Sequence, residues 1–282
     1  MKAELVSRAM AAAAALAAEL RLRVDDAVVI HNSNKLALRL LPCGVFARVA
    51  LAGREAAALE GRDRSAAGWT CYEVVAPDRV LAGAYADALA RLHTGMRSAG
   101  ITTPHFLDRA AAAERLVTHQ GETPALTETG RRLLLSTLQS TRERIHRRGA
   151  AEQLLHSEPH PGNLLRTRDG LLFTDFETCC RGPIEFDVAH VPQEVSACYP
   201  DVDHVLLAEC RRLALAMVAA WRWAIGDEFP DGDQHGRDIL SLLGQGPPWP
   251  ALGTLAAGEP NALTRRAWAD AEPPDRGDRE SP

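Results

Sequence analysis

The sequence predicts an α+β fold with two lobes: a small β-rich lobe at residues 1–76 and a larger, mainly helical lobe at residues 77–270. Three observations support this prediction. Apolar and β-branched runs within 27–51 are separated by turn residues, as in antiparallel strands. Later segments carry apolar residues at helical spacing, and a strand–turn–strand pattern at 163–177 lies among them. The polar, proline-containing residues 271–282 are expected to form a disordered tail.

The N-terminal stretch "MKAELVSRAMAAAAALAAEL" predicts an amphipathic helix, although its lysine and its alanine run also resemble an export signal. We favour the helix because Glu4 and Arg8 interrupt the start and Glu19 follows without a polar cleavage region. No apolar run approaches the roughly 20 residues that span a bilayer. The sequence therefore predicts a cytoplasmic protein with no membrane partner.

The rest of the first lobe is expected to be mainly β-structure. Three strands are separated by turns at 32–34 and 42–44. A short helix at 53–60 and a fourth strand at 68–75 complete the lobe.

The second lobe is predicted to consist of helices around one hairpin. Its first helix opens at Pro77 and Asp78, since proline is favoured in a first turn, and runs to about Met96. The apolar face of this helix carries Leu81, Tyr85, Ala88 and Leu92. Further helices are predicted in pieces over 97–126, at 127–148 and from about 201 to 224, followed by acidic turns rich in Gly and Pro.

The overall charge argues against one class of partner. With 37 acidic and 32 basic residues the formal net charge is −5, so a nucleic-acid partner is not expected. The six cysteines form no C-x-x-C pair, and a chain of 282 residues does not need disulfides, so free thiols are expected. Cys179 and Cys180 could form a metal site with His190, but adjacent cysteines rarely bind one zinc, and buried thiols are the favoured interpretation.

The stretch "HSEPHPGNLL" holds two histidines at the i, i+4 spacing that binds zinc on a helix. Pro159 and Pro161 prevent a regular helix here, because each lacks an N–H donor and disfavours the helical conformation in the residue before it. His156 and His160 are therefore expected to make structural hydrogen bonds rather than to bind zinc. Glu158, between them, needs another explanation.

Phosphoryl transfer from ATP offers that explanation. It needs a carboxylate that orients the acceptor hydroxyl and takes its proton, and oxygen ligands that hold Mg2+ against the phosphates. Kinases supply the carboxylate and one ligand from a single loop, in which an asparagine follows five residues later. Glu158 and Asn163 have this spacing, and Asp175 closes the following hairpin, where the second ligand is expected.

The segments "LLHSEPHPGNLL" and "GLLFTDFETCCRGPIEFDVAH" closely resemble the aminoglycoside phosphotransferase family, relatives of choline kinase with a protein-kinase-like fold. The family loop typically reads H-G-D-x-H-x-x-N, and a W-D-x-A element follows the metal-binding aspartate. Residues 186–189 match this element, and "ALARLH" at 88–93 resembles the helix that precedes the catalytic lobe. The resemblance is specific over 154–194 and implies a bilobal protein-kinase-like fold.

The resemblance implies a role for each matching residue. Glu158 lies at the position of the catalytic base, and Asn163 and Asp175 lie at the positions of the magnesium ligands. Asp187 lies at the position of a structural aspartate that braces the loop, and His156 is expected to make hydrogen bonds beneath it.

Two residues depart from the family loop: Glu158 replaces the usual Asp, and Ser157 replaces Gly. The additional methylene moves the carboxylate by about one bond length, and misplacement by about 1 Å can lower a rate on the order of 100-fold. Both kinds of carboxylate are ionised near neutral pH, so the chemistry is retained if the backbone compensates.

The family places Lys or Arg in the third strand, where it contacts the nucleotide phosphates and pairs with a helix glutamate. Arg48 matches this cation, although it could equally be a surface residue, and Glu55 or Glu60 would be its partner. Backbone donors at 32–34 could also contact phosphate. Only eight residues separate Glu60 from the predicted strand at Trp69, so the first lobe is expected to be trimmed.

These observations predict a Mg2+-dependent enzyme that moves the γ-phosphate of ATP or GTP to a hydroxyl of a small acceptor. The resemblance extends to enzymes of antibiotic resistance, because family members phosphorylate aminoglycosides and macrolides as well as amino alcohols. Residues 185–233 carry ten acidic residues against three arginines, which is either a solvated helix surface or a negative cleft for a cationic acceptor such as an aminoglycoside. The alternative function, supported by the trimmed lobe and Glu158, is a non-catalytic protein that binds nucleotide or ligand without turnover. The oligomeric state is left open.

Overall fold

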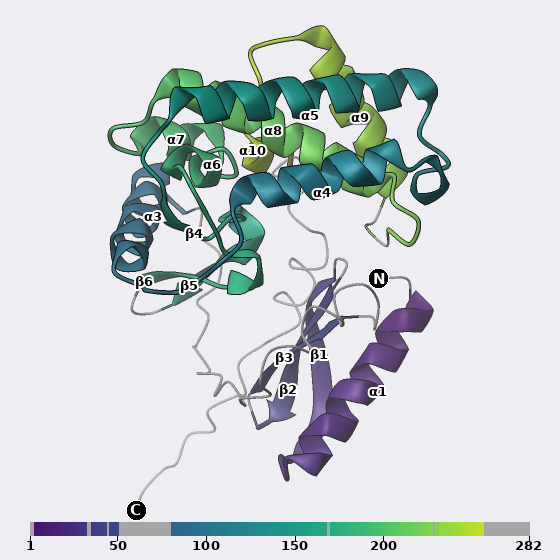
Figure 1. Cartoon of the computed structure of the whole chain (residues 1–282). Helices are drawn as coiled ribbons and strands as arrows, with labels where there is room; N and C mark the ends of the chain where they lie inside the picture. The colour runs from purple at the N-terminus through teal and green to yellow at the C-terminus, as the bar shows by residue number, and fades with distance from the viewer. Residues whose placement is uncertain are drawn as a thin grey trace, which may run out of the picture. The chain divides into compact units, whose positions relative to one another are not determined.

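The computed structural model describes residues 3–32, 35–43, 45–50, 80–167, 170–227, 229 and 231–256. The chain divides into two compact units, residues 1–72 with 259–282 and residues 73–258 (Figure 1). The predicted lobe boundary between residues 76 and 77 lies outside the described residues. The predicted helix at 53–60, the strand at 68–75 and the tail at 271–282 lie outside them as well.

Within its described residues, the first unit contains the predicted helix and three-stranded antiparallel sheet. The elements are α1 (Ala3–Glu19), β1 (Val24–Asn32), β2 (Lys35–Pro42) and β3 (Val45–Ala50), in the strand order β1-β2-β3. Leucines that alternate along β2 pack against alanines spaced four apart on α1, so each set lies on one face of its element. This buried cluster consists of Ala9, Ala13, Ala17, Leu36, Leu38 and Leu40.

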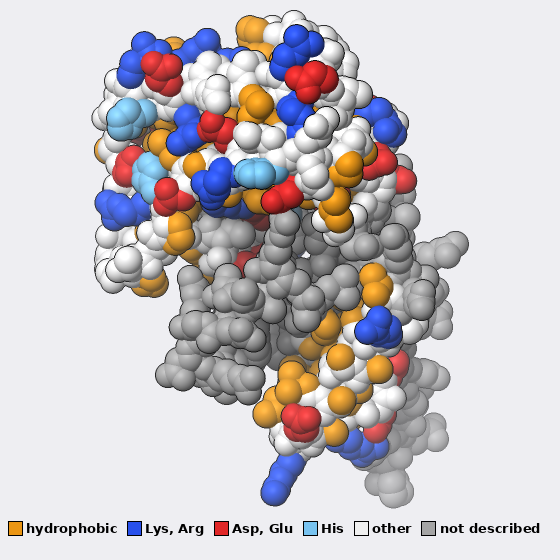
Figure 2. Space-filling view, turned by 45° about the vertical axis from the view of Figure 1, so that its right-hand side comes forward, with side chains coloured by type: hydrophobic (Ala, Val, Ile, Leu, Met, Phe, Trp, Pro, Cys, Tyr) orange, Lys and Arg blue, Asp and Glu red, His pale blue; other side chains and the backbone are white. Residues whose placement is uncertain are grey.

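The other side of α1 is also rich in apolar residues. Figure 2 shows apolar side chains along the visible side of this helix, and Leu16 is 57 % exposed. The alanine run therefore forms a surface helix with apolar residues on both faces. This composition explains why the same stretch resembles an export signal in the sequence.

The second unit is mainly helical, as predicted. Its described helices are α3 (Ala82–Arg97), α4 (Phe106–Thr118), α5 (Glu128–Arg148), α6 (Ile184–Val188), α7 (Gln193–Cys198), α8 (His204–Arg222), α9 (Gly232–Gln245) and α10 (Leu252–Ala256), with 3-10 turns η1 (Gln120–Glu122), η2 (Pro161–Asn163) and η3 (Phe176–Thr178). Its described strands are β4 (Gln153–Leu155), β5 (Leu164–Thr167), β6 (Gly170–Phe173) and β7 (Cys180–Gly182). Strand β5 pairs with β6 as the predicted hairpin, and β4 pairs with β7, both antiparallel. Helix α8 packs against α4, α5 and α9 (Figure 1). None of the described helices is long and apolar enough to cross a membrane.

Helix α5 has a capping interaction at its start and a glycine at its end. The hydroxyl of Thr127 accepts a hydrogen bond from the N–H of Gly130 at 3.1 Å and caps the first turn. Gly149 ends the helix with a φ of 59°, a left-handed conformation that glycine adopts at little cost.

Helix α3 begins later than predicted. Leu81 has an extended conformation and is the residue before the helix, which starts at Ala82. Its side chain is 73 % exposed, so the prediction that Leu81 belongs to the buried face is wrong. Tyr85 and Ala88 are buried on that face, as predicted.

Helix α9 was not predicted, because its glycines suggested turns. The structure gives a reason for one of them. A Cβ atom at Gly236 would lie 3.0 Å from the Cβ of Arg222 and 3.2 Å from the ring of Trp223. Glycine therefore lets α9 pack closely against the end of α8, and this packing outweighs the low helix propensity of glycine.

Candidate active site

The loop between β4 and β5 is fastened to the carboxylate of Asp187. Oδ2 of Asp187 accepts a hydrogen bond from the N–H of His156 at 2.9 Å, and Oδ1 accepts one from the N–H of Ser157 at 2.7 Å. Ser157 has a φ of 77°, which is uncommon for a residue other than glycine. Such a conformation persists where its surroundings fix it, and the two hydrogen bonds do so here.

Asp187 has a third partner in this fully buried site. It lies in α6, and its Oδ2 also accepts from Nε2 of His93 on α3, at 2.9 Å. Nδ1 of His93 lies 2.6 Å from the hydroxyl of Tyr199, within hydrogen-bonding distance. Burial alone would raise the pKa of Asp187, but the hydrogen bond and charge of His93 hold it below its ordinary value. Asp187 is therefore ionised and connects the loop with α3.

The two histidines of the loop make separate hydrogen bonds. His156 is buried, and its Nε2 donates to the carbonyl of Thr174 at 2.9 Å. His160 precedes η2, where its Nδ1 accepts from the N–H of Gly162 at 3.1 Å. These are the structural hydrogen bonds expected in place of a helical zinc site.

Asn163 has an amide whose orientation is fixed by its partner. Its Nδ2 donates to the carbonyl of Glu158 at 2.9 Å, and because a carbonyl can only accept, the amide nitrogen must face it. Among the described residues, no group donates to Oδ1 of Asn163. An amide oxygen that accepts no hydrogen bond from these residues is a suitable ligand for a hard cation such as Mg2+.

Asp175 lies at the same end of the β5–β6 hairpin as Asn163. The residue before it, Thr174, donates from its N–H to the carbonyl of Asn163 at 2.9 Å. Asp175 has a φ of 71°, a second left-handed conformation outside glycine. Strained backbone of this kind clusters at ligand-binding positions. The structure thus brings together the two predicted metal ligands.

The carboxylate of Glu158 forms an ion pair with Arg109 of α4. Nη2 of Arg109 donates to Oε1 of Glu158, and Nη1 donates to Oγ of Ser157. Burial would raise the pKa of Glu158, but the charge and hydrogen bond of Arg109 outweigh it and lower the pKa to about 2. Glu158 is therefore ionised at neutral pH.

The residues predicted to hold the nucleotide lie in the first unit. Arg48 is in β3, opposite Ala37 of β2, and its side chain lies outside the described part of the chain. Glu55 and Glu60 lie outside the described residues altogether. The roles of these three residues remain predictions.

The prediction of two buried thiols is confirmed for Cys180 but not for Cys179, which is only partly buried. Cys180 is buried in β7, and burial raises the pKa of its thiol to about 12. Nδ1 of His190 donates to the carbonyl of Phe186 at 2.8 Å, and burial lowers the pKa of His190 to about 4. In the part of the chain that the structure describes, no three His, Cys, Asp or Glu side chains gather into a set that could hold a metal ion.

A sequence model of the phosphotransferase enzyme family matches residues 21–224, which is most of the chain. The chain belongs to this family. Membership confirms the resemblance seen in the sequence and the enzyme class that it implies, a phosphotransferase. The sequence has no match among curated proteins.

Solved structures of small-molecule kinases have the same fold. Choline kinase from Streptococcus pneumoniae is 15 % identical, with a TM-score of 0.58, and the match covers 83 % of this chain and 99 % of that chain. Ethanolamine kinase from Plasmodium vivax is 10 % identical, with a TM-score of 0.55 and coverage of 81 % and 85 %. Amicoumacin kinase is 11 % identical, with a TM-score of 0.56 and coverage of 87 % and 96 %. At these identities the similarity confirms the bilobal kinase-like α+β fold.

Sequence reasoning missed three residues that support the phosphotransferase loop. His93 closes the "ALARLH" segment, which was the one signal pointing to it. The hydroxyl of Tyr85 donates to the carbonyl of Pro159 at 2.6 Å, although Tyr85 was predicted only as a buried apolar residue. Arg109 has no signal in the sequence, because it lies in a stretch predicted only as helical pieces.

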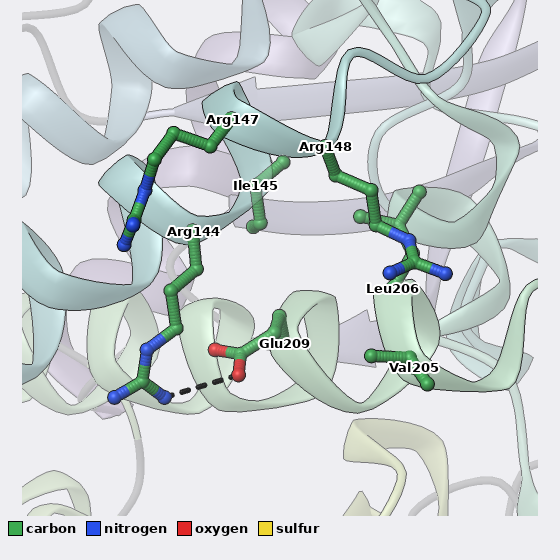
Figure 3. Close-up of a pocket in the computed structure, with 7 residues that line it drawn as sticks. All are labelled: Arg144, Ile145, Arg147, Arg148, Val205, Leu206 and Glu209. Atoms are coloured by element: carbon green, nitrogen blue, oxygen red, sulfur yellow. Dashed lines mark hydrogen bonds and ion pairs between the residues drawn. The ribbon is translucent and has the colours of Figure 1, made fainter.

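A surface hollow of about 380 Å³ lies between α5 and α8 (Figure 3). It is lined by Arg144, Ile145, Arg147, Arg148, Val205, Leu206 and Glu209. None of these residues belongs to the loop or the hairpin. Arg144 pairs with Glu209 at 3.1 Å, and Arg148 pairs with Asp203 (Figure 3 draws the first pair). The hollow is therefore distinct from the candidate active site.

Proposed function

We propose that the protein is a Mg2+-dependent kinase of small molecules, which moves the γ-phosphate of ATP or GTP to a hydroxyl of its acceptor. The observation that carries this proposal is the loop geometry. Consecutive N–H groups bound to Asp187 hold the segment that bears Glu158 and Asn163, and Asp175 lies at the same end of the hairpin. The proposal also draws on membership of the phosphotransferase family.

Each loop residue has a proposed role in that reaction. Glu158, ionised at neutral pH, would orient the acceptor hydroxyl and take its proton. His156 and Asp187 would keep the loop in place. Since phosphoryl transfer proceeds through a loose transition state, the main contribution of these residues would be positioning.

The donor set at the hairpin fits Mg2+. Asn163 offers an amide oxygen and Asp175 a carboxylate, and Mg2+ is commonly held by one or two protein ligands together with phosphates and water. When bound, the ion would supply positive charge beside the nucleotide phosphates. The amicoumacin kinase structure contains AMP-PNP and Ca2+, which supports a divalent ion and a nucleotide in the proposal.

The co-substrate is proposed to be ATP or GTP. The structural neighbours include a choline kinase with AMP and a spectinomycin phosphotransferase with ADP. In this protein Arg48 would contact the phosphates, with Glu55 or Glu60 as its ionic partner. A nucleoside triphosphate as co-substrate favours a cytoplasmic location.

A screen of hydroxylated acceptors for nucleoside diphosphate release tests the proposal. Turnover that requires Mg2+ would support it. The second candidate function, nucleotide or ligand binding without turnover, is supported by Glu158 in place of the usual Asp. It predicts that Mg-ATP raises the melting temperature while no acceptor yields diphosphate.

Asp175→Asn is expected to lower the affinity for Mg-ATP at least about tenfold, because second-sphere changes alone often cost that much in metal affinity and this carboxylate is a proposed ligand. The amide keeps the size of the side chain, so the melting temperature should change little. Calorimetric titration with Mg-ATP measures the affinity. Asp87→Asn, at an exposed position of α3, is the matched control. Equal affinity in the two variants would remove Asp175 from the metal site.

We infer that the acceptor is cationic from the many acidic residues in 185–233. Five of the ten acidic residues in 185–233 accept hydrogen bonds from backbone N–H groups or pair with arginine or histidine. They are Glu185, Asp187, Asp203, Glu209 and Asp227. Four others are exposed, namely Glu194, Asp201, Asp231 and Asp233, and Glu228 lies outside the described residues. A cationic acceptor, such as an aminoglycoside, would be attracted by these exposed charges. An aminoglycoside acceptor would make the protein an antibiotic-resistance enzyme.

Binding of such an acceptor is expected to weaken as salt is added, because exposed charges are screened over about 10 Å at 0.1 M salt. The measurement is the acceptor KM over a salt series at constant Mg-ATP. A KM that does not change with salt, or an acceptor that is neutral or anionic, would contradict this prediction without affecting the proposed reaction.

A further inference from the structure

We propose that Arg109 is a positioning residue that holds Ser157 and the proposed catalytic Glu158 as one unit, an inference that rests on the proposed function. The guanidinium reaches both residues, with Nη1 donating to Oγ of Ser157 and Nη2 to Oε1 of Glu158. These are also the two residues that depart from the family loop. Arg109, from helix α4, therefore contacts both of the residues that differ from the family loop.

The longer side chain explains why such a residue is useful. Glutamate has one more rotatable bond than aspartate, so fixing its carboxylate in one position costs more conformational entropy. A planar guanidinium removes that freedom by charge-assisted hydrogen bonding. The contact with Ser157 fixes the plane of the guanidinium at the same time. Because phosphoryl transfer depends on positioning, a well-placed carboxylate can serve even when its basicity is low.

The start of helix α4, which carries Arg109, is tied to strand β7. The N–H of Arg181 in β7 donates to the carbonyl of Pro104, just before the helix, at 2.8 Å. Gly182 lets Phe106 pack directly against β7, since a Cβ atom at Gly182 would lie 2.6 Å from the phenyl ring. Strand β7 pairs with β4, which leads into the loop. Arg109, in α4, is thus tied to the β4–β7 strand pair, and β4 leads into the loop that bears Glu158.

Other basic groups lie near Glu158 but have partners of their own. His190 is hydrogen-bonded to the carbonyl of Phe186, and its lowered pKa keeps it neutral. Arg222 pairs with Asp227 at 3.1 Å, and His160 accepts from a backbone N–H of the loop. Among the described residues, Arg109 is the cation within ion-pair distance of Glu158.

The test compares kcat and acceptor KM in the full-length protein. Arg109→Met is expected to lower kcat by about 100-fold, as for misplacement of a catalytic group by about 1 Å, with little change in acceptor KM. Arg109→Lys keeps the charge but lacks the planar fork, so it should recover only part of this loss. Arg115→Met, at an exposed position of the same helix, is the matched control and should behave as wild type.

A mutant cycle tests whether Arg109 acts through the loop. In a Ser157→Gly/Glu158→Asp background the carboxylate no longer reaches the guanidinium, so Arg109→Met should change kcat by less than about twofold, the usual error for independent sites. An equal loss in both backgrounds, or a lysine variant as active as wild type, would overturn the proposal.

An unchanged kcat of Arg109→Met in an active enzyme would overturn this inference alone, whereas an inactive wild type would overturn the proposed function itself.

Discussion

Replacing Glu158 with glutamine is expected to lower kcat by about 100-fold or more, within the range of roughly 10²–10⁴ that general acid–base catalysis contributes. The neutral amide keeps the size of the side chain but cannot take the proton of the acceptor hydroxyl. Affinity for Mg-ATP should change little, because this carboxylate is proposed to face the acceptor rather than the phosphates. Steady-state kinetics with an acceptor from the screen and calorimetry with Mg-ATP measure the two effects.

Glu152→Gln is the matched control for this change. Glu152 lies in the same unit and also pairs with a basic side chain, His105, at 2.9 Å, but it precedes β4 and is not part of the loop. A Glu158→Gln variant that is as active as this control would exclude Glu158 as the base. A loss of nucleotide affinity in Glu158→Gln alone would mean that its carboxylate serves the phosphates instead.

Glu158→Asp distinguishes two states of the loop backbone. If the backbone has adjusted to the longer side chain, aspartate falls about 1.5 Å short of its target and kcat should fall. The ion pair with Arg109 supports this outcome, because the guanidinium meets the carboxylate at its present reach. A rise in kcat would instead mean that the loop retains the geometry suited to aspartate.

The parts of the site that depend on residues close together in the sequence could be predicted from it. The spacing of Glu158 and Asn163 predicted a kinase loop, and the turn before Gly170 predicted the hairpin that brings Asp175 to it. These features follow from proline, glycine and local polar spacing, which act over a few residues. The prediction of the two-lobed α+β fold was confirmed for the same reason, since its helices and strands have clear local patterns.

The contacts that hold the loop could not be predicted in this way. Arg109 and His93 reach the loop and its brace from helices far away in the sequence, and only tertiary packing places them there. Helix α9 was missed because low propensity at Gly236 is outweighed by close packing against Trp223. In each case the decisive interaction joins residues whose proximity has no signature in local spacing.

Replacing Asp187 with alanine is expected to lower the free energy of unfolding by about 3–5 kcal/mol, as for removal of one partner from a buried charged pair. The change leaves three buried donors without an acceptor: the N–H groups of His156 and Ser157 and the ring N–H of His93. Asp187→Asn should cost nearly as much, because its amide nitrogen would face at least one of these donors. Chemical denaturation followed by circular dichroism measures both changes.

The pH dependence of this lower free energy of unfolding shows whether the charge of Asp187 stabilises the loop or whether its side chain only contributes packing. The folded pKa of Asp187 is held below the unfolded value, so its charge stabilises the protein above the unfolded pKa of about 3.9, and this stabilisation is lost as pH falls through the folded pKa. The difference between wild type and Asp187→Ala should therefore shrink in acid. Glu194→Ala, an exposed change on α7, should stay within about 0.5 kcal/mol of wild type. If Asp187→Ala costs no more than this control at neutral pH, the aspartate does not brace the loop, and the left-handed conformation of Ser157 must be held by its contact with Arg109 instead.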